Sequence, residues 1–274
     1  MNEKRKEEMQ TDFEAAADKL AERFDRALRE SDFWDSIIWL RRRFRRFGPV
    51  RLWVVGGTIR DFVLETSNMI IDVDIMVENC PSMEILEEAI TAGGTFRKNM
   101  MGGYKWLPSL EVSKTEEPLE IDMWRIEESI EPGDEPTPEM GVSRFDLNIN
   151  ALGWEVEERR FVNPLGGLEI ILDESRTAPM ELLTEKIKPG NAPRLILRAI
   201  KYGAKLGFPL GAETRQWIRK NERQLDQLSP DKIRYVFRAI DSGAIRKEIE
   251  ECCDELLTTP YAAKVKDSLF GAKD

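Results

Sequence analysis

The chain has 274 residues, of which 41% are hydrophobic and 34% charged, and its formal net charge is −10. This length suits one or two ordinary domains with a substantial core under a charged surface. The sequence contains no histidine, which excludes Ser-His-Asp hydrolases and histidine-ligated zinc sites. The three cysteines follow no metal or disulfide spacing, and there is no signal peptide or apolar membrane-spanning stretch, so we expect a cytoplasmic protein.

The net charge conceals an uneven distribution along the chain. Residues 76–140 hold fifteen acidic side chains against five basic ones, whereas residues 186–247 hold fifteen basic side chains against five acidic ones. Charges more than about 10 Å apart are largely screened at cellular salt, so a polyanion responds to the local patch. We therefore expect the segment 186–247 to bind RNA. The alternative is an ordinary solvated helix face.

The chain is predicted to begin with a helical arm over residues 1–47. Apolar residues recur at helical spacing over residues 11–30, and a break at Ser31 separates this helix from a second one over residues 33–44. Gly48 ends the second helix. Charged residues fill the remaining faces, so we expect the arm to pack on its own protein through the apolar face.

After the arm, the pattern predicts an α/β head over residues 48–165 and an all-α neck with an abbreviated body over residues 166–274. The head is expected to contain a small mixed sheet with helices. Strands are predicted at residues 51–55, 69–77, 119–126 and 147–156, helices at 58–64, 82–92, 192–206, 212–225 and 230–239, and a proline-containing loop at 127–140.

The first predicted strand ends in two glycines, Gly56 and Gly57, and a helix is predicted from Thr58. Bare backbone N–H groups at the positive end of a helix dipole are suited to binding phosphate. The turn is therefore a candidate phosphate cradle.

Two aspartates, Asp72 and Asp74, lie on the next predicted strand. Side chains at i and i+2 of a strand share one face, so both carboxylates are expected to project into one site, with Ile71, Val73 and Ile75 burying the opposite face. Neighbouring carboxylates repel unless a cation lies between them, and hard oxygen ligands favour Mg²⁺. The pattern indicates phosphoryl or nucleotidyl transfer. A surface strand with two acids is the structural alternative.

A third carboxylate is expected from a neighbouring strand. Glu120 and Asp122 share one face of the strand predicted at residues 119–126, and either is a candidate. An acidic edge strand without a catalytic role is the alternative.

Five segments, in chain order, resemble motifs of class II tRNA nucleotidyltransferases (CCA-adding enzymes) and bacterial poly(A) polymerases. VVGGTIRD with IDVDI resembles the head-domain signature, RFDLNINAL the motif that positions ribose and triphosphate, and NPLGGLE the hinge between head and neck. The two neck segments are PRLILRAIKYGAKLGF and LSPDKI. The five segments occupy residues 54–75, 144–152, 163–169, 193–208 and 228–233.

The resemblance implies transfer of NMP from an NTP to the 3′ end of an RNA, with tRNA the expected acceptor. It implies that Asp72 and Asp74 hold two Mg²⁺ ions and that the third carboxylate, Glu120 or Asp122, completes the catalytic set. It also implies a set of nucleotide-binding residues, namely Gly56, Gly57, Thr58, Arg60, Arg144, Asp146, Asn150, Asn191, Arg194 and Arg198.

Some positions differ from the family's motifs, and we expect these differences to affect the choice of substrate more than the type of reaction. In the family, an Asp and an Arg of the neck pair with the incoming base, and Ala192 and Leu195 occupy those positions here. Phe145 replaces the second Arg of the ribose motif. We therefore expect non-standard base selection, with Asn191 and Arg194 reading a different base or none strictly.

Two other functions remain open from the sequence. One is a toxin-like or phage-type enzyme that transfers NMP to a protein or to a modified tRNA end. The other is a non-catalytic module of the same fold that binds RNA or nucleotide. The intact pair Asp72 and Asp74 disfavours the second, because a module that only binds has no use for two mutually repelling carboxylates.

Overall fold

The computed structural model of the chain describes residues 3–64, 69–99, 102–131, 133–183, 190–238 and 240–271. The chain divides into two compact units. Unit 1 comprises Met1–Phe145 and Ile149–Leu172, and unit 2 comprises Asp146–Asn148 and Asp173–Asp274. The predicted class is confirmed, since unit 1 combines helices with a sheet and unit 2 is helical. The boundary expected after residue 165 stays a prediction.

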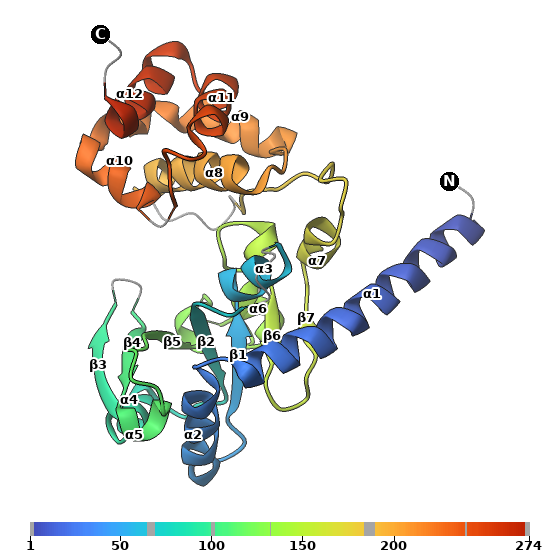
Figure 1. Cartoon of the computed structure of the whole chain (residues 1–274), viewed down its shortest axis with the longest axis vertical. Helices are drawn as coiled ribbons and strands as arrows, with labels where there is room; N and C mark the ends of the chain where they lie inside the picture. Colours follow the sequence, from blue (N-terminus) through green and yellow to red (C-terminus); the bar gives the residue numbers. More distant parts are fainter. Residues whose placement is uncertain are drawn as a thin grey trace. The chain divides into compact units, whose positions relative to one another are not determined.

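Unit 1 is built on a sheet that has seven strands in the described residues, in the order β3-β4-β5-β2-β1-β6-β7 (Figure 1). Strands β2 and β5 run parallel, and the other neighbours are antiparallel. The strands are β1 (Arg51–Val55), β2 (Val73–Glu78), β3 (Gly94–Lys98), β4 (Tyr104–Pro108), β5 (Ile121–Arg125), β6 (Gly153–Glu155) and β7 (Phe161–Val162). The helices are α1 (Glu3–Glu30), α2 (Trp34–Phe44), α3 (Gly57–Leu64), α4 (Met83–Thr91), α5 (Leu110–Ser113), α6 (Pro138–Val142) and α7 (Gly167–Ile171).

One face of the sheet is apolar and packs against the helical arm and α4. Phe24 of α1 is fully buried, and its ring lies 5.5 Å from Trp154 of β6 and 5.2 Å from Phe62 of α3. On β4, the indole of Trp106 donates a hydrogen bond to the carbonyl of Ile90 at 2.9 Å. The arm is therefore part of the core of unit 1, as the apolar spacing of residues 11–30 predicts.

The opposite face carries a second apolar cluster beside a row of charged residues. Trp53, Val55 and Met76 form this cluster with Val142 of α6. Register partners lie on the same face of a sheet, and Val55 is the partner of Asp74. The cluster therefore anchors the strand that presents the acids.

Several predicted boundaries were wrong. The strand expected over residues 69–77 is paired only from Val73, and Ile71 is 68% exposed instead of burying a face. The first ladder pair joins Val73 to Ile121, so no neighbouring strand covers Ile71. The strand expected over residues 147–156 is limited to Gly153–Glu155 and is preceded by a 3₁₀ turn.

Short elements without strong periodicity escaped prediction. Strands β3 and β4 each have five residues, and the loop expected over residues 127–140 includes the start of α6. By contrast, β1 has the predicted bounds, and α4 begins where expected because the Ser82 hydroxyl accepts the N–H of Ile85 as an N-cap.

Unit 2 consists of helices arranged around the buried face of α8. Its main helices are α8 (Ala192–Leu206), α9 (Ala212–Asn221), α10 (Pro230–Phe237), α11 (Arg246–Leu256) and α12 (Thr259–Phe270). Gly207, with φ of +73°, ends α8 in the left-handed conformation typical of a helix C-terminus. The start of the predicted basic segment, residues 186–189, lies outside the described residues.

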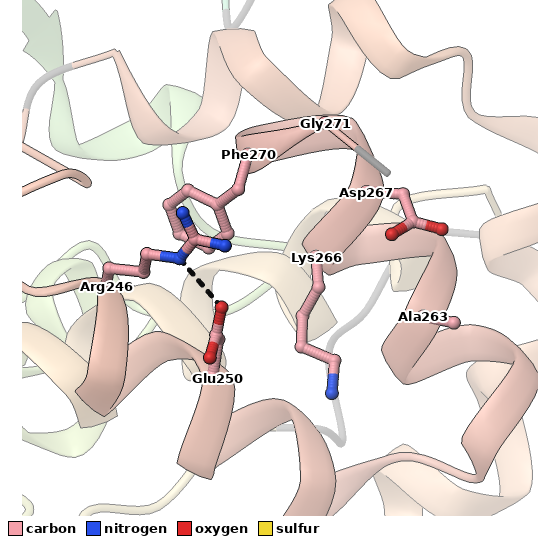
Figure 2. Close-up of a pocket in the computed structure, with 7 residues that line it drawn as sticks. All are labelled: Arg246, Glu250, Ala263, Lys266, Asp267, Phe270 and Gly271. Atoms are coloured by element: carbon pink, nitrogen blue, oxygen red, sulfur yellow. Dashed lines mark hydrogen bonds and ion pairs between the residues drawn. The ribbon is translucent and has the colours of Figure 1, made fainter. Parts of the chain in front are cut away.

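A hollow of about 240 Å³ lies between α11 and α12. Figure 2 shows the residues that line it. Arg246 lies over the ring of Phe270 at 4.6 Å and donates a hydrogen bond to Glu250 at 2.8 Å. The lining contains none of the residues expected to bind nucleotide or metal. None of the helices within the described ranges combines the length and apolar character that a bilayer crossing requires.

The packing of α1 predicts that the arm stabilises unit 1. Replacement of Phe24 by Ala removes a fully buried ring, so Phe24→Ala is expected to lower the free energy of unfolding by about 3–5 kcal/mol. Leu110→Ala is the control, because Leu110 is exposed and its loss should cost less than about 0.5 kcal/mol. Urea titration followed by circular dichroism measures both, and equal stability of the two variants would contradict the docking of the arm.

Candidate active site

The site begins at the turn that follows β1. The antiparallel pairing of Val55 with Asp74 places this turn beside the start of β2. Gly56 has φ of +70°, and its N–H donates a hydrogen bond to the carbonyl of Leu152 at 3.0 Å. A Cβ at Gly56 would lie 3.0 Å from the ring of Phe145. Both the backbone conformation and the close approach therefore require glycine.

Helix α3 begins immediately after this turn, at Gly57. The next residue, Thr58, is buried, and its hydroxyl accepts a hydrogen bond from the backbone N–H of Asp74 at 3.4 Å. The hydrogen bond links the start of α3 to the strand that carries the acids. The glycine turn and the first acidic strand are thus held together locally.

Arg60 of α3 is only 3% exposed. Its Nε donates to Asp61 at 2.8 Å, and its Nη1 donates to the side-chain oxygen of Asn150. Arg60 and Asn150 are thus brought together, and Arg60 braces α3 against the 3₁₀ turn Asn148–Asn150. These contacts support a role in shaping the turn, and a direct contact of Arg60 with phosphate stays a prediction.

Three carboxylates gather on one face of the sheet. Asp74 of β2 and Asp122 of β5 are register partners in the parallel pair. Asp72 lies two residues before Asp74 and interacts electrostatically with both of the other acids. The structure therefore brings Asp122, one of the two candidates for the third carboxylate, together with the predicted pair Asp72 and Asp74.

Burial and mutual repulsion disfavour the ionised carboxylates. Burial, followed by the charges of Asp72 and Asp122, raises the pKa of Asp74 to about 7. Desolvation of its carboxyl group and the charge of Asp122 also raise the pKa of Asp72 above its ordinary value, although the residue as a whole is exposed. The cationic Lys105 partly offsets both shifts. Such a site stores electrostatic repulsion that a bound divalent cation relieves.

The geometry favours Asp122 over Glu120 as the third carboxylate. Asp122 is in register with Asp74, whereas Glu120 precedes β5 and is exposed. Glu120 accepts a hydrogen bond from Arg97 at 3.0 Å and another from Lys105 at 2.9 Å. Assignment of the third ligand to Asp122 remains a prediction.

The donor set fits Mg²⁺ in its chemistry, since it consists of carboxylate oxygens of Asp72, which lies just before β2 and not on the strand as predicted, and of Asp74 and Asp122 on the adjacent strands β2 and β5. Asp72 and Asp74 would hold the ion, with Asp122 beside them. Within the residues that the structure describes, no three such side chains already converge on a single point suited to a metal ion.

The segment RFDLNINAL, residues 144–152, has residues in both units. In unit 1, Arg144 forms ion pairs with Asp134 at 2.8 Å and Glu131 at 3.5 Å. The ring of Phe145 packs over the glycine turn and lies 6.2 Å from the ring of Trp124. Two aromatic rings thus lie beside the turn, and one of them, Phe145, occupies the position where the family resemblance implies a second Arg.

In unit 2, Asp146 forms an ion pair with Arg198 of α8, so these two predicted residues are brought together. The guanidinium of Arg198 also lies over the ring of Tyr202, 5.1 Å from its centroid. Asn191 and Arg194 are both exposed at the start of α8. Roles of these side chains in nucleotide binding stay predictions.

Sequence reasoning missed Lys105 as a residue of this site. The Lys105 ammonium lies 3.3 Å from Asp122 Oδ2, and the two residues are register partners in the antiparallel pair β4–β5. The available signal was the alternation of Lys105 with the buried Tyr104 and Trp106, which indicates that Lys105 faces the other side. The register that brings it to Asp122 depends on tertiary pairing.

Comparison with known proteins finds similarity to poly(A) polymerases and CCA-adding enzymes. The sequence model of the poly(A) polymerase head domain matches residues 52–175. A CCA-adding enzyme of Bacillus cytotoxicus (strain DSM 22905 / CIP 110041 / 391-98 / NVH 391-98) is 24% identical over 255 residues, which is 85% of this chain and 55% of the relative. The chain thus spans little more than half the length of the relative that it matches.

Solved structures show the same fold at low sequence identity. A CCA-adding enzyme solved with ATP matches with a TM-score of 0.56 and 18% identity, over 86% of this chain and 57% of the other. A CCA-adding enzyme of Thermotoga maritima solved with tRNA matches with a TM-score of 0.50 and 18% identity, over 82% of this chain and 48% of the other.

The repulsion among the carboxylates predicts a pH-dependent stability of the metal-free protein. Because the pKa of Asp74 is raised to about 7 from 3.8, its cost to folding is absent below about pH 4 and complete above about pH 7. Asp74→Asn removes this cost, so the metal-free variant is expected to melt about 5 °C above the wild type at pH 8 and equally at pH 4.

Differential scanning calorimetry in EDTA measures this difference. Mg²⁺ should raise the melting temperature of the wild type at pH 8 and have less effect on Asp74→Asn. Asp18→Asn is the control, since Asp18 is exposed on α1. A wild type that melts at or above the variant at pH 8 without metal would contradict the stored repulsion.

Proposed function

Because residues 52–175 match the poly(A) polymerase head domain and the chain is similar to a CCA-adding enzyme, we propose that it is an Mg²⁺-dependent enzyme that adds NMP from an NTP to an RNA 3′ end. One observation carries the proposal. The glycine turn after β1 lies beside the register-paired Asp74 and Asp122, so a phosphate cradle and a carboxylate set share one edge of the sheet.

Different residues of unit 1 have different roles in the proposed nucleotidyl transfer. The backbone N–H groups at Gly57 and the start of α3 bind the triphosphate, and Thr58 holds this turn against β2. Asp72 and Asp74 supply ligand oxygens for Mg²⁺. When bound, Mg²⁺ neutralises the triphosphate and favours ionisation of the acceptor 3′-hydroxyl.

The reaction then follows from this arrangement. The 3′-oxygen of the acceptor forms a bond to the α-phosphorus, the bond between that phosphorus and the α,β-bridging oxygen breaks, and pyrophosphate leaves. The hydroxyl proton passes to solvent. No step requires histidine, in agreement with the composition of the chain.

We assign RNA binding to unit 2, with tRNA as the proposed acceptor. Basic side chains of the segment from α8 to α10 are exposed, namely Arg194, Arg219, Lys220, Arg223, Lys232, Arg234 and Arg238. Cations of this kind bind the phosphate backbone and release its counterions. The tRNA complex of the Thermotoga maritima relative supports the choice of acceptor.

Base selection is proposed to differ from that of CCA-adding enzymes. The two positions that pair with the base in the family hold Ala192, which is buried, and Leu195, which is half-buried. Neither side chain can donate or accept a hydrogen bond. Discrimination among bases therefore depends on other groups of the neck, such as Asn191 and Arg194, and is expected to be weak.

Incorporation of labelled nucleotide tests the activity. Purified protein is incubated with Mg²⁺, 3′-trimmed tRNA and each of the four α-labelled NTPs in turn. Label is expected on tRNA, and Asp72→Ala is expected to reduce it by about a thousandfold, since the metal contributes several kcal/mol to transition-state stabilisation. Asp18→Ala is the matched control, because Asp18 is an exposed aspartate of α1.

The other outcomes identify the alternatives. Label on polypeptide instead of tRNA would move the acceptor to protein. Absence of label on either, together with Mg²⁺-independent NTP binding, would leave a non-catalytic nucleotide-binding module. Equal labelling by wild type and Asp72→Ala would place the reaction at other residues.

A second prediction concerns base selection. The double substitution Ala192→Asp with Leu195→Arg restores the family's pairing groups at the start of α8. The ratio of CTP and ATP incorporation to UTP and GTP incorporation should rise about tenfold, since a bidentate pair discriminates by about 1–3 kcal/mol. Leu195→Met is the control for packing. An unchanged ratio in the double variant would show that these positions do not face the base.

A further inference from the structure

A lysine stands among the acids of the candidate site. Lys105 lies on β4 and its backbone pairs with Asp122 of β5, which in turn pairs with Asp74 of β2. Register partners share a face, so this lysine and the two aspartates form one row across three strands. Its side chain is 26% exposed, so its charge is only partly screened by solvent.

The ammonium of Lys105 has two carboxylate partners. It lies 2.9 Å from Glu120 Oε2 and 3.3 Å from Asp122 Oδ2. Burial alone would lower the pKa of Lys105, but these contacts outweigh burial and raise it. The lysine therefore carries its charge throughout the physiological range.

The charge of Lys105 acts on the whole carboxylate set. It also attracts the carboxylates of Asp72 and Asp74 electrostatically. Arg60 also interacts with Asp74, but its guanidinium is engaged by Asp61 and Asn150. Among the residues that the structure describes, Lys105 is thus the cation that forms an ion pair with Asp122.

We propose that Lys105 is a built-in counter-ion that competes with divalent metal for Asp122 and so lowers the metal affinity of the nucleotide-free site. It is a positioning residue, since it acts through Asp122. The inference rests on the proposed function, because it takes the carboxylates as the metal site.

Glu120 remains a partner for Lys105 when a metal ion displaces the lysine from Asp122. Glu120 is outside the register pair of Asp74 and Asp122, and it also pairs with Arg97. When a metal ion binds the carboxylate of Asp122, the Lys105 ammonium keeps its hydrogen bond to Glu120 and is not left without a partner. Exchange between lysine and metal therefore avoids the penalty of an unpaired charge.

Mn²⁺ titration of the nucleotide-free protein, followed by electron paramagnetic resonance of the free ion, tests this role. Lys105→Met removes the competing charge and should lower the Kd for Mn²⁺ about tenfold. Lys105→Arg retains the charge and should resemble the wild type. Lys98→Met is the matched control, because Lys98 lies on the neighbouring strand β3 and forms its ion pair with Glu87 of α4.

An unchanged or higher Kd in Lys105→Met would overturn the inference, since a lysine that only joins β4 to β5 would alter stability without tightening metal binding. Thermal melts establish that each variant is folded, and Lys105→Gln replaces Lys105→Met if the latter is not. The variant Asp72→Asn distinguishes failure of the proposed function from failure of the inference alone. If wild-type Mn²⁺ binding does not depend on Asp72, the proposed function fails; if it does and Lys105→Met binds as the wild type does, only the inference fails.

Discussion

The register of β2 between its two neighbours is the constraint on which the site depends. It pairs Asp74 with Val55 on one side and with Asp122 on the other, and β4 adds Lys105 to the same row. A shift of one residue would turn Asp74 to the face that packs against the helices. The glycine turn also depends on this pairing, because Gly56 follows Val55 directly.

Such a register must be held against the repulsion of its own acids. The apolar cluster of Trp53, Val55 and Met76 lies on the acidic face, and the aromatic contacts around Phe24 and Trp106 cover the other. Burial of this area on both sides offsets the electrostatic cost of the carboxylates. The helical arm thus contributes to function indirectly, by stabilising the sheet.

Much of this could be predicted from residues 51–78, where a buried strand, two glycines and an alternating acidic strand follow one another. Local periodicity does not specify which strands become neighbours. It therefore left Glu120 and Asp122 equivalent, and it placed Ile71 in a ladder that begins only at Val73. Lys105 was missed for the same reason, since its role depends on a partner seventeen residues away on another strand.

The central claim is that the row of carboxylates beside the glycine turn is the metal and nucleotide site. Anomalous diffraction from crystals containing Mn²⁺ and a non-hydrolysable NTP analogue tests it most directly. The account predicts anomalous density within about 2.5 Å of carboxylate oxygens of Asp72 and Asp74, with the triphosphate against Gly57. Density only elsewhere, for example beside Glu250 and Asp267 in the hollow of unit 2 (Figure 2), would contradict it.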